Sequence, residues 1–445
     1  MDPLPDTYYA KTADGVYIAY QVIGDGPIDV VSQPDWPGNI DMEQDDPLGG
    51  PWFREVASFS RLILHDRRGI GLSSRNVALP NLETRVSDLL TVLEAVGSER
   101  PVLVGIFESG APNALLAATK PERVHSMVWQ EPNPRFAWAP DYPWGRTSED
   151  MEAELRDIEL WGTIAYGRAF LQDEATRENV MPDSEVAHLA KASRNACTPD
   201  VARALARIWY ETDVRSILPA VQVPTLVLAK RSREEDFRRA SYVASLIPGA
   251  ELHETPGLEW TEDDMRSTAE EIRRFAGVDR PAPELDTILS TVLFTDIVGS
   301  TEKQAALADH GWKKLIERHH AIVRGSLVRW HGVENDTAGD GFYATFEGPA
   351  RAIRCAQEVG ERVRDLGIEI RAGVHTGECE LIDNKVGGLA VTIGARIASN
   401  AGPSEVLISQ TVKDLDAGPG LTFADAGEHE LKGVPDRWRL YRVVG

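Results

Sequence analysis

The stretch Thr291–Thr301, TVLFTDIVGST, decides the fold of the second half of the chain. Its apolar, β-prone run at 292–294 predicts a buried strand that ends at Asp296. Gly299 then interrupts the strand pattern, and a helical pattern follows, with a helix cap expected at Thr301. A carboxylate at a strand end beside a helix N-terminus can hold a divalent cation and a polyphosphate together. The stretch therefore predicts either a nucleotide site or, more simply, a buried strand with a capping turn.

A second acidic residue, Asp340, lies further along the chain in the segment TAGDGF, Thr337–Phe342. Glycines on both sides of it, between two short β-like runs, predict a tight hairpin turn. If this turn places Asp340 beside Asp296, the two carboxylates form a two-metal site. Such a site activates a hydroxyl and neutralises a leaving pyrophosphate.

Five segments resemble the catalytic domain of class III nucleotidyl cyclases in their order and spacing: FTDIVGST, TAGDGF, IRAGVHTGE, GGLAVTIGARI and ELKGV. The resemblance covers residues 289–445 and implies an α+β, ferredoxin-like fold. It also implies an adenylate cyclase, which converts ATP to 3′,5′-cyclic AMP and pyrophosphate. Two Mg²⁺ or Mn²⁺ ions per site would be bound by Asp296, Asp340 and the backbone carbonyl of Ile297.

The same resemblance assigns roles to four residues of the later segments. Arg371 and Lys432 would bind phosphates, and Arg396 would stabilise the charge of the transition state. Thr392 stands where the family has an asparagine, and it shares a helix face with Arg396. In this family Arg396 and Lys432 come from the partner subunit, so the resemblance implies a homodimer with two equivalent sites. From the residues alone, each of these cations is equally a surface charge.

The two base-selecting positions carry exchanged charges. The family has a lysine where this chain has Asp336, and an aspartate where it has Lys385. The pair would either contact adenine through both groups or form a closed salt bridge that contacts no base. We expect weaker discrimination between bases than in a standard member, with ATP still preferred. The double exchange Asp336→Lys with Lys385→Asp is expected to sharpen that preference.

Residues 1–278 alternate strand and helix patterns, which is typical of a mainly parallel α/β sheet covered by helices. Three segments resemble the α/β-hydrolase fold: HDRRGIGLSS, PVLVGIFESGAPNALLAATKPERV, and VPTLVLA with IPGAELHETPG. Residues 134–218 break the alternation and predict a helical cap, and the proline-rich segment 279–288 predicts a linker. Strands are expected at 29–31, 62–64, 101–105 and 224–229, and helices at 84–96 and 111–119.

The catalytic triad of α/β-hydrolases is broken in this sequence. Phe107 occupies the nucleophile position of the strand-to-helix elbow, and Trp260 occupies the position of the histidine. Ser109 lies two residues beyond the elbow and is expected to point elsewhere, so we expect no hydrolase activity. The domain is then either a plain scaffold or a regulatory pocket for a small apolar molecule. Such a pocket would be lined by Phe107, Trp260 and the cap residues Trp138, Trp144, Trp161 and Trp209.

The composition of the chain bears on its binding partners, on the state of its cysteines and on its location in the cell. The net charge of −23 disfavours nonspecific binding to nucleic acids and to anionic membranes. The three cysteines lie far apart without CxxC spacing, which favours reduced thiols. No signal peptide or apolar run of membrane-spanning length is recognised, so we expect a cytoplasmic protein. Two other functions stay open: a degenerate cyclase that binds nucleotide without efficient turnover, and an esterase with a cyclase-like regulatory tail.

Overall fold

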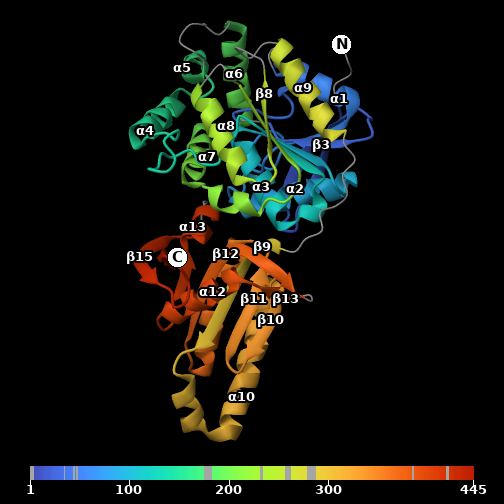
Figure 1. The fold of residues 1–445 in the computed structure, drawn as a ribbon. Coiled ribbons are helices and arrows are strands. Elements are labelled where there is room, and N and C mark those ends of the chain that lie inside the picture. Colours follow the sequence, from blue (N-terminus) through green and yellow to red (C-terminus); the bar gives the residue numbers. More distant parts are fainter. Residues whose placement is uncertain are drawn as a thin grey trace. The chain divides into compact units, whose positions relative to one another are not determined.

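The chain divides into two compact units, Met1–Pro283 and Glu284–Gly445, which are described separately (Figure 1). The predicted linker, 279–288, lies outside the described residues except for its last two positions, which begin the first strand of the second unit. The computed structural model describes residues 5–34, 36–43, 46, 49–174, 183–230, 234–255, 262–277, 287–382, 385–416 and 420–444.

The first unit is built on a sheet whose described strands follow the order β1-β2-β4-β3-β5-β6-β7-β8. The strands from β3 to β8 pair in parallel, and β1 and β2 pair antiparallel at one edge. The interior parallel strands β3 to β7 are buried along nearly their whole length because helices cover both faces, whereas the edge strand β8 is mostly polar. The strands are β1 (Thr7–Lys11), β2 (Tyr17–Ile23), β3 (Asp29–Ser32), β4 (Arg61–His65), β5 (Val102–Ile106), β6 (Ser126–Gln130), β7 (Thr225–Lys230) and β8 (Glu251–Thr255).

The helices of this sheet pack in pairs, α1 against α9 and α2 against α3. α2 shows why these helices begin and end where they do. The Asn81 side chain accepts a hydrogen bond from the Thr84 amide at its start, and Gly97, with φ of 65°, ends it. The helices around the sheet are α1 (Gly50–Phe59), α2 (Leu82–Val96), α3 (Gly110–Thr119), α8 (Glu234–Leu246) and α9 (Glu262–Ala276).

A helical cap is inserted between β6 and β7, as the sequence predicts. It contains α4 (Ser148–Asp157), α5 (Ile164–Glu174), α6 (Asp183–Ala196) and α7 (Pro199–Glu211). Trp161 and Trp209 are buried and pack on Trp36. Trp138 is exposed, and Trp144 packs on two tyrosines. The pocket that these tryptophans were expected to line stays a prediction.

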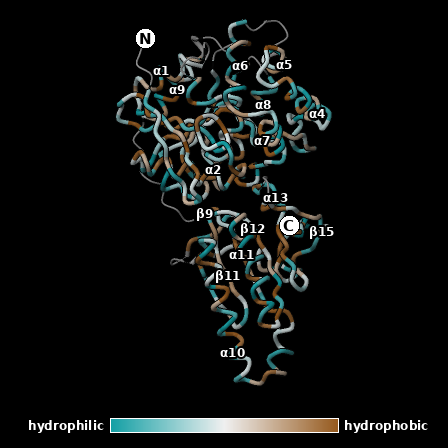
Figure 2. Tube along the Cα trace, turned by 180° about the vertical axis from the view of Figure 1, so that it is seen from behind, coloured by the Kyte–Doolittle hydropathy of each residue, from teal (hydrophilic) through white to brown (hydrophobic). Residues whose placement is uncertain are grey.

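The second unit is built on a mixed sheet with the described order β10-β11-β9-β12-β14-β16-β15, and β13 pairs with β12. β9 lies between β11 and β12 and runs antiparallel to both. Together with α10, α11 and α12 this is the predicted α+β arrangement, with apolar residues on the interior strands (Figure 2). The strands are β9 (Thr287–Ile297), β10 (Val333–Ala338), β11 (Gly341–Phe346), β12 (Ile370–Ile382), β13 (Lys385–Gly387), β14 (Val406–Ser409), β15 (Phe423–Glu430) and β16 (Arg437–Val443).

The helices of this unit are α10 (Ser300–Arg329), α11 (Pro349–Arg362), α12 (Leu389–Asn400) and α13 (Gln410–Leu415). The cap predicted at Thr301 is wrong: α10 begins after Gly299, whose φ of 65° suits a glycine, and no side chain caps it. α10 is also interrupted at Ala308, where φ and ψ are 52° and 171°. Within the part of the chain that the structure describes, no helix has the length and apolar character needed to cross a bilayer.

Candidate active site

Three strand ends meet where the sequence places the acidic residues. Asp296, near the end of β9, pairs in register with Arg371 at the start of β12. Asp340 lies in the turn between β10 and β11, and β11 begins beside the end of β9. Gly339, with φ of 65°, allows this tight turn, so the predicted hairpin is present. The topology therefore brings Asp296, Asp340 and Arg371 to one edge of the sheet.

Asp340 is half-buried, and its surroundings show what it faces. Burial raises its pKa, the nearby Asp296 carboxylate raises it further, and a hydrogen bond with Ser300 opposes the change. The Oδ2 atom of Asp340 is buried and has no hydrogen-bond partner among the described residues. A buried carboxylate oxygen without a partner is costly, so it indicates that a group outside the chain completes the site.

The donor set suits a hard divalent cation. Carboxylate and carbonyl oxygens are the ligands that Mg²⁺ and Mn²⁺ prefer. The Ile297 side chain is buried in the core, so only its backbone is available to such an ion. Among the described residues, no group of three or more His, Cys, Asp or Glu side chains is assembled for a metal. Asp296 and Asp340 therefore fit a site whose other ligands come from the backbone, from water and from substrate phosphates.

Arg371 forms an ion pair that the sequence did not predict. Its Nη2 and Nε atoms donate to Asp296 Oδ2 at 2.5 and 3.1 Å. Both side chains are 36% exposed. An ion pair with this much exposure contributes at most about 1 kcal/mol. A polyphosphate can therefore replace the carboxylate as the partner of Arg371.

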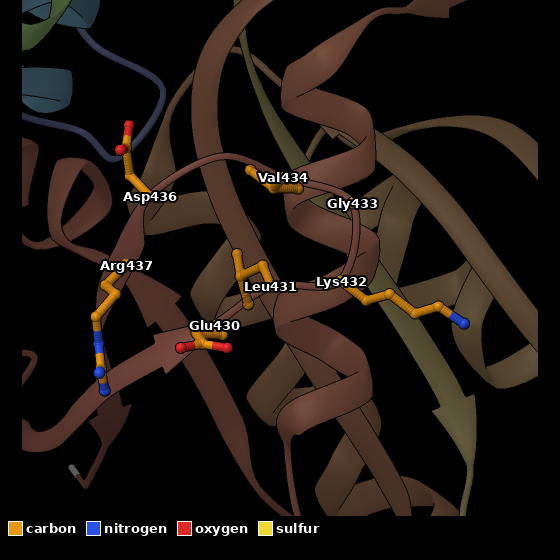
Figure 3. Close-up of a pocket in the computed structure, with 7 residues that line it drawn as sticks. All are labelled: Glu430, Leu431, Lys432, Gly433, Val434, Asp436 and Arg437. Carbon is orange, nitrogen blue, oxygen red and sulfur yellow. The ribbon is translucent and has the colours of Figure 1, made fainter.

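A second group of predicted residues gathers on α12 and on the loop between β15 and β16. Arg396 Nε donates to the backbone carbonyl of Lys432 at 3.0 Å, which fixes the loop to the helix. Thr392 lies one turn before Arg396 and is exposed. The loop surrounds a cavity of about 570 Å³, and the Lys432 side chain extends outward from it (Figure 3). The lining residues are Glu430, Leu431, Lys432, Gly433, Val434, Asp436 and Arg437.

The two groups are not joined within the described part of this chain. No hydrogen bond or ion pair there connects Asp296, Asp340 or Arg371 with Arg396 or Lys432. The assignment of the two groups to two faces of a shared site stays a prediction. Completion of the site by a second copy stays a prediction.

The predicted base-selecting positions are only partly described. Asp336 is exposed on β10, and its Oδ1 accepts a hydrogen bond from the Thr337 amide at 2.9 Å. Lys385 begins β13, and its side chain lies outside the described residues. The predicted contact between the two charged groups therefore stays a prediction.

Tyr343 links the two strands that carry these positions. Its backbone pairs in register with Asp336. Its hydroxyl donates to the carbonyl of Val386 at 2.9 Å, next to Lys385. Its ring stacks on Phe294, with centroids 4.7 Å apart and an interplanar angle of 3°. The position of Tyr343 makes it a candidate positioning residue that sequence reasoning missed.

In the first unit, the strand-to-helix elbow keeps its geometry without a nucleophile. Phe107 has φ of 46°, a strained value for a bulky residue. A Cβ on Gly105 would lie 2.4 Å from Gly110 Cα, so glycines allow β5 and α3 to approach closely. The Ser109 hydroxyl turns back to the Ile106 backbone, donating to its carbonyl and accepting from its amide at 2.7 Å each. The Ser109 hydroxyl therefore points back to the backbone, as predicted, and Trp260 lies outside the described residues.

Comparison with known proteins identifies the second unit. Residues 285–445 match the family model described as the adenylate and guanylate cyclase catalytic domain. This unit is a class III cyclase domain. A putative adenylate cyclase from Rhizobium meliloti is 29% identical over 162 residues, which cover 33% of this chain and 26% of that protein. The resemblance recognised in the sequence is confirmed for the cyclase domain.

The first unit has the α/β-hydrolase fold. The crystal structure of a bromoperoxidase from Bacillus anthracis superposes with a TM-score of 0.53 at 20% identity, over 61% of this chain and 100% of that one. The putative carbamate hydrolase RutD of a Caulobacter species is 26% identical over 186 residues, covering 40% of this chain and 65% of that protein. The chain thus spans only part of the length of either curated relative.

Two further residues of the cyclase domain were missed by sequence reasoning. Ser300 begins α10 and hydrogen-bonds with Asp340. His319 is fully buried against Phe342, and neither of its ring nitrogens has a hydrogen-bond partner in the described part of the chain. The signal that would have located His319 is its place in the apolar stripe of α10, between Ile316 and Val323.

Proposed function

We propose that this protein is an adenylate cyclase, which converts ATP to 3′,5′-cyclic AMP and pyrophosphate by two-metal catalysis. The observation that supports it best is the meeting of Asp296 and Asp340 at one strand end, with a buried carboxylate oxygen that no described residue satisfies. The match of residues 285–445 to the cyclase family supports the same reaction class. ATP as the preferred nucleotide is part of the proposal.

In the reaction, the 3′-oxygen of the ribose loses its proton and attacks the α-phosphorus, and the bond from that phosphorus to the leaving pyrophosphate breaks. Divalent cations held by Asp296, Asp340 and the Ile297 carbonyl would supply Lewis acidity at the phosphoryl oxygens. Arg371 leaves its ion pair with Asp296 and binds the β- and γ-phosphates. These residues thus orient the chain of phosphates for in-line displacement.

The other side of the site belongs to a second copy of the chain. Arg396 presents a planar guanidinium to the charge that spreads over the reacting phosphate. Lys432 binds the polyphosphate from the cavity loop, and the Thr392 hydroxyl contacts the ribose or a bound water. The family resemblance assigns the two groups of residues to different protomers, so in this proposal a C2 homodimer forms two equivalent sites.

The first unit acts, in this proposal, as a regulatory domain that has lost hydrolase activity. Phe107 supplies no nucleophile, and Ser109 is held by its own backbone. The intact elbow and cap are those of a fold that binds small molecules. A small ligand with an apolar body is therefore the proposed signal.

The test is cyclic AMP formation from ATP with Mn²⁺ by the full chain and by Asp340→Ala. The wild type is expected to form cyclic AMP. The variant is expected to be at least about 100-fold slower, because a metal ligand supplies several kcal/mol of transition-state stabilisation. Asp365→Ala, at an exposed position of the same domain, is the matched control and should leave the rate unchanged.

Two results would contradict the proposal. A wild type that binds ATP and forms no cyclic AMP is a degenerate cyclase. If Asp340→Ala forms cyclic AMP as fast as the wild type, the carboxylate pair has no part in the reaction.

A further inference from the structure

The first unit buries a cluster of charged side chains that its lost hydrolase chemistry does not explain. The cluster contains Gln33, directly after β3, Arg67, two residues after β4, and Glu108, two residues after β5, together with Arg85 of α2. β4, β3 and β5 are neighbours in the sheet. These side chains therefore lie at the carboxyl ends of adjacent parallel strands, where α/β sheets bind their ligands.

Two guanidinium groups share one carboxylate in this cluster. Arg67 Nη1 and Arg85 Nη1 donate to the two oxygens of Glu108, the second at 2.7 Å. With its amide oxygen turned toward them, Gln33 accepts from Arg67 Nε at 3.0 Å and from Arg85 Nη2 at 3.2 Å. The side chains of Arg67, Arg85 and Glu108 are only 3%, 9% and 5% exposed. Buried charges of this kind require complete pairing to be tolerated.

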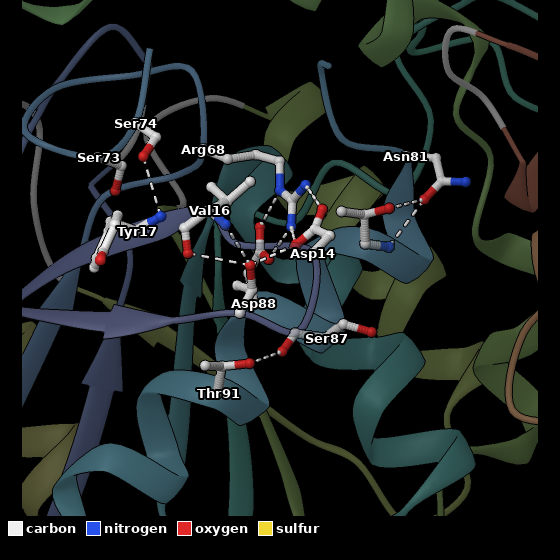
Figure 4. A network of polar contacts seen from close by, with 12 residues as sticks. Asp14, Val16, Tyr17, Arg68, Ser73, Ser74, Asn81, Ser87, Asp88 and Thr91 are labelled. Atoms are coloured by element: carbon white, nitrogen blue, oxygen red, sulfur yellow. Dashed lines mark hydrogen bonds and ion pairs between the residues drawn. The ribbon is translucent and has the colours of Figure 1, made fainter. Parts of the chain in front are cut away.

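Arg68, the neighbouring arginine, is paired with two carboxylates. Arg68 binds Asp88 through Nε and Nη2 at 2.7 and 2.6 Å, and Asp14 through Nη1 at 2.8 Å (Figure 4). Asp88 is thereby occupied by Arg68. Asp66 accepts hydrogen bonds from the Ile40 and Leu72 amides, and burial raises its pKa to about 7. Neither carboxylate replaces the missing partner of Arg67.

Arg67 is left with an unused donor, and its guanidinium lies beside a cap residue. Its Nη2 atom is buried and has no hydrogen-bond partner among the described residues. Its guanidinium lies 5.4 Å from the ring centroid of Trp209 in α7. Trp209 in turn packs edge-on against Trp36, with centroids 4.5 Å apart. A fixed cationic donor and an aromatic surface therefore adjoin each other beneath the cap.

Two titratable groups near this donor, His65 and Cys197, are neutral. Burial, together with the charges of Arg85 and Arg67, lowers the pKa of His65 to about 4. Burial raises the pKa of the Cys197 thiol, in the cap, to about 12. Neither the His65 imidazole nor the Cys197 thiol therefore offers an anion to Arg67.

The elbow supplies a further reason to expect an anion here. In a working α/β-hydrolase, the amide that follows the nucleophile helps to bind an oxyanion. In this chain the corresponding amide belongs to Glu108, because Phe107 occupies the nucleophile position. The strained turn at Phe107 is retained, although it presents no nucleophile. Retention of this turn suits a domain that binds a permanently anionic ligand rather than one that makes an anion by catalysis.

We propose that the first unit binds an apolar monocarboxylate of the fatty or arylacetic acid class, with the carboxylate on Arg67 Nη2 and the apolar body against Trp209 and Trp36. This inference deepens the regulatory role proposed above by assigning the ligand a negative charge. Because binding is measured without any turnover, it stands or fails separately from cyclase activity.

The test is a titration of the full chain with hexanoate and with phenylacetate, each compared with its uncharged amide, followed by tryptophan fluorescence and calorimetry. The acids are expected to bind at least about tenfold more tightly than the amides, because only a carboxylate makes a charge-assisted hydrogen bond with Arg67. Arg67→Gln is expected to remove this preference for the acid. Arg207→Gln, an exposed arginine on the same cap helix as Trp209, should retain it.

A second variant keeps the test informative if Arg67→Gln does not fold. Trp209→Leu leaves the Arg67–Glu108 pair intact and removes the aromatic surface. It is therefore expected to lower the affinity for the acid and the affinity for the amide by the same factor. Three results would overturn the proposal. These are equal affinity for acid and amide, no binding of either acid up to about 10 mM, and unchanged acid binding by a folded Arg67→Gln variant.

Discussion

Tyr343 connects the strands that carry the two predicted base-selecting positions. Its ring stacks on Phe294, its backbone pairs with Asp336, and its hydroxyl holds the Val386 carbonyl. Asp336 and Lys385, the predicted base-selecting residues, lie on β10 and β13. Their relative placement therefore depends on a residue that contacts neither base nor phosphate in the proposed mechanism.

We expect Tyr343→Phe to reduce the preference for ATP over GTP by about five- to tenfold, the value of one hydrogen bond of about 1 kcal/mol. The change should appear in the KM ratio of the two nucleotides, with kcat for ATP retained, because the ring stack and the carboxylates remain. Tyr441→Phe is the matched control, since its hydroxyl bonds Gln410 away from this site. An unchanged KM ratio in Tyr343→Phe would show that the hydroxyl has no part in base selection.

At this scale, the sequence predicts some contacts and not others. The meeting of Asp296 and Asp340 follows from a strand end and a glycine-flanked turn, both visible in local sequence. The Arg371–Asp296 ion pair depends on the register of β12 against β9, which no local pattern specifies. The roles of the predicted site residues stay predictions until activity is measured.

Among the elements, α12 depends on a close contact with β9. A Cβ placed on Gly394 would lie 2.5 Å from Val292 Cγ2 and 3.3 Å from the Phe294 ring. The absent side chain lets the helix lie directly on β9, the strand that carries Asp296. The placement of Arg396 and Thr392, on the same helix, therefore depends on this glycine.

We expect Gly394→Ala to destabilise the cyclase domain by about 1–3 kcal/mol through overpacking and to lower its rate by displacing Arg396. Gly360→Ala is the matched control. Gly360 also lies in a helix, α11, but a Cβ there meets nothing within 4 Å, so alanine should stabilise by about 0.5 kcal/mol. Urea unfolding followed by circular dichroism and the cyclase rate measure both effects. If Gly394→Ala and Gly360→Ala had the same unfolding free energy and the same cyclase rate, the close contact of α12 with β9 would be contradicted.

The sequence predicts long elements better than short ones. The buried strands β3, β4, β5 and β7 and the helices α2 and α3 are present close to their expected bounds, because apolar runs and helical periodicity extend over several residues. β13 is only three residues long, which is too short for a period to appear. The break at Ala308 has no sequence signal, since alanine favours a continuous helix.

At the scale of the whole molecule, the first unit lacks a hydrolase nucleophile, and the second unit carries the residues proposed for cyclase activity. The α/β-hydrolase fold is intact through its elbow and cap, yet Phe107 occupies the position of the nucleophile. The cyclase domain holds the carboxylate pair. The chain as a whole is therefore expected to work as a cyclase with a ligand-responsive first unit, and not as an esterase.

We expect the purified full chain to hydrolyse p-nitrophenyl acetate and butyrate no faster than the buffer. Phe107→Ser is also expected to remain inactive, because a serine needs an adjacent base and Trp260 occupies the position of the histidine. Release of p-nitrophenol measures both. Ester hydrolysis well above background by the wild type would contradict the loss of the triad.

The most direct test of the shared two-carboxylate site is a mixing experiment with Asp340→Ala and Arg396→Ala. Each variant alone is expected to be inactive, because each lacks one side of every site. A heterodimer of the two contains one site with both sides intact. An equal mixture, exchanged by dilution and reassembly, is therefore expected to recover about a quarter of the wild-type rate of cyclic AMP formation. A mixture as inactive as its two components would contradict a site built from both protomers.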